Sequence, residues 1–168
     1  MVVWINGAFG VGKTSVAKTI VARSRRTVLF DPETIGVGLS LLSRTVGADS
    51  RDLPSWRRWT VRGVTIAAKL YECVVVPMTV VNPDYFEELL GTLRRRVEVR
   101  HFTLVAPPET IRERLRQRGD AGSWAEAKVQ KCTEAHAAPM FAMHVSTLDR
   151  TIQDIAEEIV WTTRSVTK

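Results

Sequence analysis

The residues GAFGVGKT at positions 7–14 have the types and spacing that bind the phosphate groups of a nucleotide. In the pattern G-x-x-x-x-G-K-[ST], glycines let backbone N–H groups approach phosphate oxygens, and the following helix N-terminus adds a partial positive charge. Lys13 is expected to reach the β- and γ-phosphates of ATP, while the Thr14 hydroxyl coordinates Mg²⁺. An ordinary turn before a helix is the alternative, but the pattern arises by chance in about one chain of this length in a hundred or fewer. The expected ATP-binding residues are Gly7, Ala8, Phe9, Gly10, Val11, Gly12, Lys13, Thr14 and Ser15.

Asp31 is the acidic residue best placed to work with this loop. It ends an apolar run over 27–31 that is typical of a strand, and Pro32 after it can begin a helix. Open α/β sheets place their chemistry at the carboxyl ends of parallel strands, so Asp31 could be a general base, a Mg²⁺ ligand or simply a helix cap. Many phosphate-loop ATPases carry a metal-binding Asp after a later strand, but here the run 73–79 ends in Pro77-Met78-Thr79. The missing acid argues against motor-type and switch-type NTPases and leaves Asp31 as the expected carboxylate near the metal.

A second group of candidate catalytic residues is the pair Arg114 and Arg118, which lie four positions apart on one face of an expected helix. The glycines in Gly119-Asp120-Ala121-Gly122 break the chain immediately afterwards. A hinged arginine segment of this kind can close over a triphosphate and stabilise charge on the transferring group. The alternative is a solvated basic helix face, which the spacing alone does not exclude.

Two tryptophans, Trp56 and Trp59, lie beside basic residues such as Arg57 in a helix expected to begin near Pro54. The pair could form the floor of an aromatic substrate pocket. A tryptophan stripe at helical spacing is more often part of the core, so both interpretations stay open.

The elements that must position these residues alternate between strand and helix. Short β-branched and aromatic runs are typical of strands buried in a parallel sheet, and they lie at 2–5, 27–31, 73–79, 97–105 and 143–147. Amphipathic or capped segments predict helices near 13–24, 54–70, 82–96, 109–118, 123–137 and 151–160. We therefore expect one domain over 1–168, an α/β fold of the P-loop NTPase class in which helices flank a doubly wound, five-stranded parallel sheet.

Composition narrows the classes of function. The formal net charge is +6 and 18 of the 24 basic residues are arginine, which fits anionic ligands, nucleic acid or an arginine-biased genome. No arginine run is interleaved with aromatic residues, so nucleic acid is the weakest of these. Cys73 and Cys132 form no C-x-x-C pair, which argues against zinc and redox motifs. No signal segment or apolar run of membrane length is present, so we expect a cytoplasmic protein without a transmembrane segment.

The chain also resembles a known family over nearly its whole length. Its motifs WINGAFGVGKT, FDPETIG, PSWRRW, VPMTVVNPDYF and RLRQR are similar to those of the tunicamycin resistance proteins, ATP-binding relatives of small nucleotide and metabolite kinases. The resemblance implies the strand order 2-3-1-4-5, an arginine lid at 114–118 and adenine contacts near 146–150. It also implies a nucleoside antibiotic as the small-molecule partner, and we expect Asp31, Trp56, Arg57 and Met78 to contact it. Some members carry an amphipathic tail after the last helix, whereas this sequence ends at Lys168, which leaves peripheral membrane contact open.

Two classes of function fit these features. In the first, the protein transfers the γ-phosphate of ATP to a hydroxyl of tunicamycin or a related nucleoside, with Asp31 as base and with contributions from Lys13, Arg114 and Arg118. In the second, it is an ATP-dependent binding protein that sequesters the antibiotic without chemistry. A regulatory kinase acting on nucleotide sugars would use the same site. The kinase resemblance and the hinged arginines favour the enzyme, as a monomer or a homodimer.

Overall fold

The computed structural model describes residues 1–32 and 52–165, and its central element is strand β1 (Val2–Gly7). All six residues of β1 are buried. Val3 and Ile5 contact one hydrophobic cluster, whereas Val2 and Trp4 contact a second cluster. Successive side chains of a strand point to opposite faces, so a continuous apolar run is what a strand covered on both sides requires.

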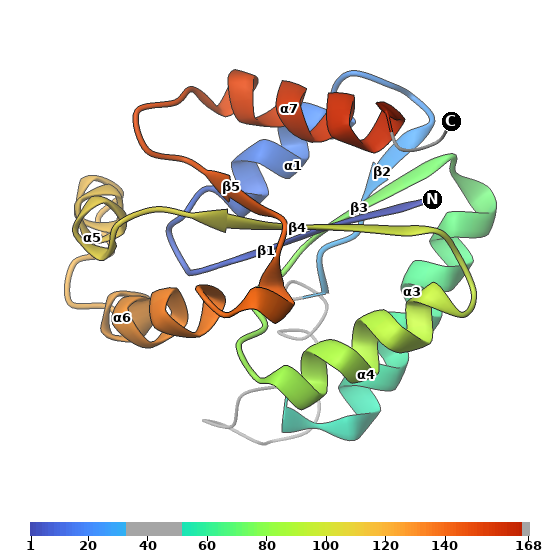
Figure 1. Ribbon diagram of the computed structural model, residues 1–168, viewed down its shortest axis with the longest axis horizontal. Coiled ribbons are helices and arrows are strands. Elements are labelled where there is room, and N and C mark those ends of the chain that lie inside the picture. The colour runs from blue at the N-terminus through green and yellow to red at the C-terminus, as the bar shows by residue number, and fades with distance from the viewer. Residues whose placement is uncertain (33–51, 166–168) are drawn as a thin grey trace.

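Five parallel strands form the sheet in the order β2-β3-β1-β4-β5. The other strands are β2 (Thr27–Leu29), β3 (Cys73–Pro77), β4 (Val99–Val105) and β5 (His144–Ser146). The expected fold class and strand order are therefore confirmed. Because β1 lies between β3 and β4, the loop that follows it emerges at the middle of the sheet's carboxyl edge (Figure 1).

Helices cover both faces of the sheet (Figure 1). One hydrophobic cluster joins the sheet to α1 (Lys13–Val21), α5 (Pro108–Gln117), α6 (Trp124–His136) and α7 (Ile152–Ser165). The other joins it to α3 (Pro54–Leu70) and α4 (Pro83–Arg94). In the described part of the chain, no helix combines the length and the apolar character needed to cross a membrane.

The fold differs from the expectation in several details, and strands β2, β4 and β5 are each shorter than expected. Strand β3 ends at Pro77 and not at Thr79, because the chain beyond it is held by a side chain of β1. The amide of Asn6 donates to the Val80 carbonyl (3.0 Å), and its Oδ1 accepts from the Val80 N–H (2.9 Å). A short 3₁₀ helix, Pro139–Phe141, also follows α6 and buries Phe141 in the second cluster.

Candidate functional site

The phosphate-binding loop lies between β1 and α1 and has the backbone that its glycines allow. Gly12 is the N-cap of α1 and has φ of 110°, a left-handed conformation that side-chain-bearing residues rarely adopt. Gly10 has φ of 82°, and a Cβ on it would lie 2.7 Å from the Cγ of Leu115 in α5. The loop therefore packs directly against the helix that carries the candidate arginines.

Lys13 is buried, and its ammonium group lies inside the loop. The Nζ atom donates to the carbonyl oxygen of Ala8 (2.9 Å) and lies 5.5 Å from the centre of the Phe9 ring. Phe9 in turn makes an edge contact with Trp124 at the start of α6, with 5.0 Å between ring centres. An ammonium group held in this position can exchange the loop carbonyl for a phosphate oxygen with a small movement of the side chain.

Thr14 and Ser15 are exposed in the first turn of α1, beside Lys13. Mg²⁺ bound to a nucleotide needs few protein ligands, because phosphate oxygens and waters supply most of its coordination. The Thr14 hydroxyl is a suitable single ligand of this kind. In residues 1–32 and 52–165, no group of three or more His, Cys, Asp or Glu side chains could hold a metal ion alone. The described residues thus fit a magnesium ion carried in with the nucleotide.

Arg114 is fixed by the loop that follows β5. Its Nη1 donates to the Thr147 hydroxyl (2.8 Å) and its Nη2 donates to the Thr147 carbonyl (2.7 Å). A longer bond of 3.5 Å joins Nη1 to the carbonyl of Val11 in the phosphate-binding loop. Arg114 therefore connects that loop to residues 146–150, the segment expected to contact adenine.

Arg118 has a different environment from Arg114, although both lie on α5 or at its end. It is the C-cap of the helix, its side chain is 66% exposed, and its Nη2 lies 3.7 Å from the Asp120 carboxylate. Gly119 and Gly122 follow it with positive φ, and nothing lies within 4 Å of a Cβ built on either. Of the two arginines, Arg118 is the more exposed and makes the longer contact.

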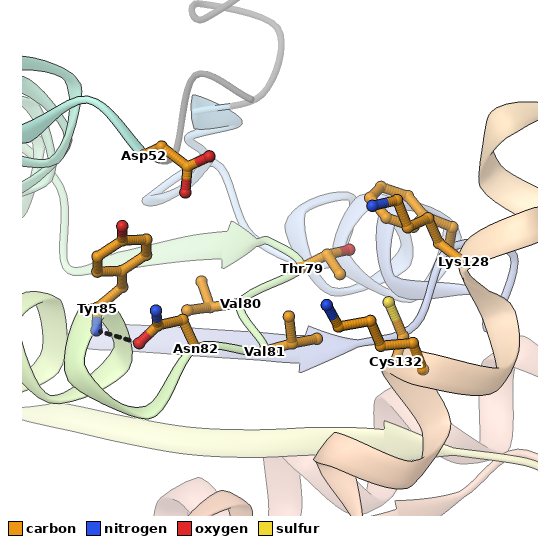
Figure 2. A pocket seen from close by; sticks show the side chains of 10 residues that line it. Asp52, Thr79, Val80, Val81, Asn82, Tyr85, Lys128 and Cys132 are labelled. Carbon is orange, nitrogen blue, oxygen red and sulfur yellow. Dashed lines mark hydrogen bonds between the residues drawn. The ribbon is translucent and has the colours of Figure 1, made fainter. Parts of the chain in front are cut away.

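A pocket of about 260 Å³ opens beside the phosphate-binding loop (Figure 2). Asp52, Asn82 and Tyr85 lie on one side of it, and Lys128 and Cys132 of α6 lie on the other. Phe9, Thr79, Val80, Val81 and Lys131 complete the lining. The pocket thus combines a carboxylate, two ammonium groups, an amide and a phenol at the carboxyl edge of the sheet.

The floor of this pocket is held by polar bonds that the motif analysis did not identify. Asn6 binds both backbone groups of Val80, and the same carbonyl accepts from Nε2 of His136 (3.0 Å). Burial lowers the pKa of His136 to about 4, and the charge of Lys13 acts in the same direction. His136 is therefore neutral at pH 7 and donates its Nε2 proton. An Asn at the end of a buried strand was the available signal, because a buried amide needs partners.

The substrate residues expected from the sequence are dispersed. Met78 and Trp56 belong to the second hydrophobic cluster, 0% and 3% exposed, and neither lines the pocket. Arg57 is also buried, but its guanidinium lies over the ring of Tyr85, 4.0 Å from its centre, and so supports the pocket wall from behind. Asp31 is half-buried just after β2, the edge strand, and is not among the pocket-lining residues.

Comparison with known proteins agrees with this geometry. The model of a family described as "AAA domain" matches residues 2–142. The structure is similar to that of the Deinococcus radiodurans tunicamycin resistance protein, with a TM-score of 0.82 and 29% sequence identity over 96% of this chain and 94% of that one. The resemblance inferred from the motifs is confirmed.

Small-molecule kinases share the fold. A gluconokinase from Sinorhizobium meliloti 1021 has a TM-score of 0.68 at 15% identity, covering 98% of this chain and 91% of that one. A shikimate kinase from Acinetobacter baumannii, solved in complex with shikimate, has a TM-score of 0.68 at 16% identity, covering 99% and 94%. A search of curated proteins found no match. By its matched family model and by the geometry of its loop, the chain belongs to the AAA domain family and is a P-loop, kinase-like nucleotide-binding protein.

Proposed function

We propose that the protein is an ATP-dependent phosphotransferase that moves the γ-phosphate of ATP to a hydroxyl of tunicamycin or a related nucleoside. One observation carries the proposal: a pocket with polar lining opens directly beside the phosphate-binding loop, and Phe9 belongs to both. A small-molecule kinase needs this adjacency, because phosphoryl transfer depends mainly on positioning the acceptor in line with the γ-phosphate.

The residues of the loop have distinct roles in this proposal. Lys13 leaves the Ala8 carbonyl and binds the β- and γ-phosphates, and the backbone N–H groups of the loop bind the remaining oxygens. Thr14 would hold Mg²⁺, which when bound neutralises charge that develops on the phosphates. Arg118, which is exposed and follows the end of a helix, closes toward the transferring group, whereas Arg114 keeps the loop and residues 146–150 in register.

Two carboxylates could accept the proton of the acceptor hydroxyl. Asp31 follows the edge strand β2, and we retain it as the expected base or Mg²⁺ ligand. Asp52 lines the pocket itself, opposite Lys128 (Figure 2). A base must lie within hydrogen-bond reach of the proton it accepts, so the comparison of Asp31→Asn with Asp52→Asn separates the two assignments.

The second candidate function is binding of the antibiotic without chemistry. It is favoured by the name of the similar Deinococcus protein, which describes resistance and no reaction. A pocket of about 260 Å³ is smaller than the usual range for ligand sites, about 300–1,000 Å³, so it would enclose only part of a nucleoside antibiotic. In either function we take residues 1–168 as one domain acting in the cytoplasm, where ATP and Mg²⁺ are supplied.

Mass spectrometry of tunicamycin after incubation with the protein and Mg-ATP tests the proposal. The expected result is a product heavier by one phosphoryl group, formed by the unmodified protein and not by Lys13→Ala. Binding of tunicamycin by the unmodified protein without such a product would establish sequestration in place of transfer. Formation of the product at equal rates by both proteins would show that another agent transfers the phosphate.

A further inference from the structure

A second hollow lies on the outer side of the molecule, between α3 and α4, and has a volume of about 320 Å³. None of the residues that the structure describes lines both this hollow and the pocket beside the phosphate-binding loop. Its lining residues are Arg57, Arg58, Val61, Arg62, Glu88, Thr92 and Arg96. We call it the α3–α4 groove.

Most of the residues that line the groove lie in two rows, one on α3 and one on α4. Arg58 and Arg62 are one turn apart on α3. Thr92 is one turn beyond Glu88 on α4, and Arg96 follows four residues later, just past the helix end. Residues one turn apart share a helix face, so both rows turn their polar groups toward the same hollow.

Among the described residues that line the groove, the one acidic side chain already has a partner. Glu88 accepts a hydrogen bond from Nε of Arg57 at 2.7 Å, and Arg57 is buried with its guanidinium against Tyr85. Within the described ranges, none of Arg58, Arg62 and Arg96 is paired with a carboxylate. The Arg62 guanidinium lies over the Trp59 ring, 5.9 Å from its centre. Three arginines therefore line the groove without a carboxylate partner among the described residues.

Thr92 adds a hydroxyl to this positive surface. Its Oγ1 accepts a hydrogen bond from Nη2 of Arg95 (3.1 Å), which leaves its own proton to be donated. Guanidinium groups match the geometry of phosphate oxygens, and hydrogen bonds to ionised phosphates are stronger than neutral ones. A solvated basic face would instead spread its charges over a convex surface, without a hollow between two helices.

We propose that the α3–α4 groove is a binding site for a small, multiply charged anion of the phosphate class, separate from the nucleotide site. The three arginines supply the charge, Thr92 supplies a directed donor, and the volume suits a group of the size of diphosphate. The site would act beside the proposed transferase or binding function and does not depend on either.

Titration of the full-length, ¹⁵N-labelled protein with sodium pyrophosphate at constant ionic strength tests this site. The amides of Val61, Thr92 and Arg96 should shift together and saturate, with a dissociation constant distinct from that reported by the amides of Gly12 and Lys13. The double variant Arg62→Gln/Arg96→Gln should raise the dissociation constant at the groove about tenfold or more, because it removes two charge-assisted contacts.

The matched control is Lys69→Gln/Arg94→Gln, which removes two positive charges from α3 and α4 outside the groove. It should leave the groove constant unchanged. Equal weakening by both double variants, or pyrophosphate shifts confined to the phosphate-binding loop, would overturn the proposal. The protein is tested in the same way for sedimentation with phosphatidylglycerol vesicles. Sedimentation that depends on Arg62 and Arg96, with no pyrophosphate shifts in the groove, would assign these arginines to a lipid surface. That result would also overturn the proposal.

Discussion

Substitution of Arg114 by Ala should destabilise the protein, because this side chain holds a buried part of the scaffold. Thr147 is 1% exposed, and both its hydroxyl and its carbonyl accept hydrogen bonds from the Arg114 guanidinium. Bonds to a charged donor contribute about 1.5–3 kcal/mol each, and water can partly replace a half-buried guanidinium. We expect the free energy of unfolding to fall by about 3 kcal/mol, which lowers the melting temperature by about 6–12 °C in a chain of this size.

Calorimetric or circular-dichroism melting of Arg114→Ala beside Arg118→Ala measures the difference. Arg118 is 66% exposed with a long ion pair, so its removal should change the free energy of unfolding by less than about 0.5 kcal/mol. If Arg114→Ala had the same melting temperature as the unmodified protein, the scaffold role would be refuted. If that variant also lost turnover, Arg114 would instead act on the nucleotide.

Three further outcomes are expected. Burial lowers the pKa values of His101 and His136 to about 4, below the value of about 6.5 in an unfolded chain, so the unfolded state binds more protons between pH 4 and 6.5. The free energy of unfolding measured with urea should therefore fall as the pH is lowered from about 6.5 to about 4. His136→Gln, which keeps a donor for Val80, should make that pH dependence weaker, and an unchanged pH dependence would contradict the assignment. Asp31→Asn should keep ATP binding and lose about 10²–10⁴-fold in phosphoryl transfer if Asp31 is the base, and a normal rate would reduce it to a cap. Arg118→Ala should lower kcat more than ATP affinity in steady-state assays, whereas a change in ATP affinity alone would make it a ground-state contact.

The sheet was predictable because its signals are local. The run Val2–Ile5, the loop 7–14 and the helix after it are contiguous in the chain, and their residue types restrict the backbone directly. The strand order came from the family resemblance and agrees with the structure. The ends of the elements were less predictable. Strand β3 stops before Val80 because the N–H and carbonyl of Val80 bind the side chain of Asn6, which lies 74 residues earlier in the chain.

The side-chain roles depended on contacts that spacing cannot express. Arg114 and Arg118 share a helix face in the sequence pattern, yet only Arg114 meets Thr147, 33 residues away. Trp56 and Met78 matched family motifs and lie in the core, while Tyr85 and Lys128 line the pocket from two different helices. Helical periodicity predicts which face is buried and does not predict which cavity an exposed face will border.

The most direct test of the nucleotide site is titration calorimetry of ATP with Mg²⁺ against the unmodified protein and Lys13→Ala. The unmodified protein should bind one ATP per chain. Lys13→Ala should bind at least about tenfold more weakly, since one lost contact to a phosphate is worth about 1.5–3 kcal/mol. Its fold should persist, because Lys13 begins α1 beside the phosphate-binding loop and belongs to neither hydrophobic cluster. Equal ATP affinity of the two proteins would contradict the assignment of residues 7–15 as the phosphate-binding site.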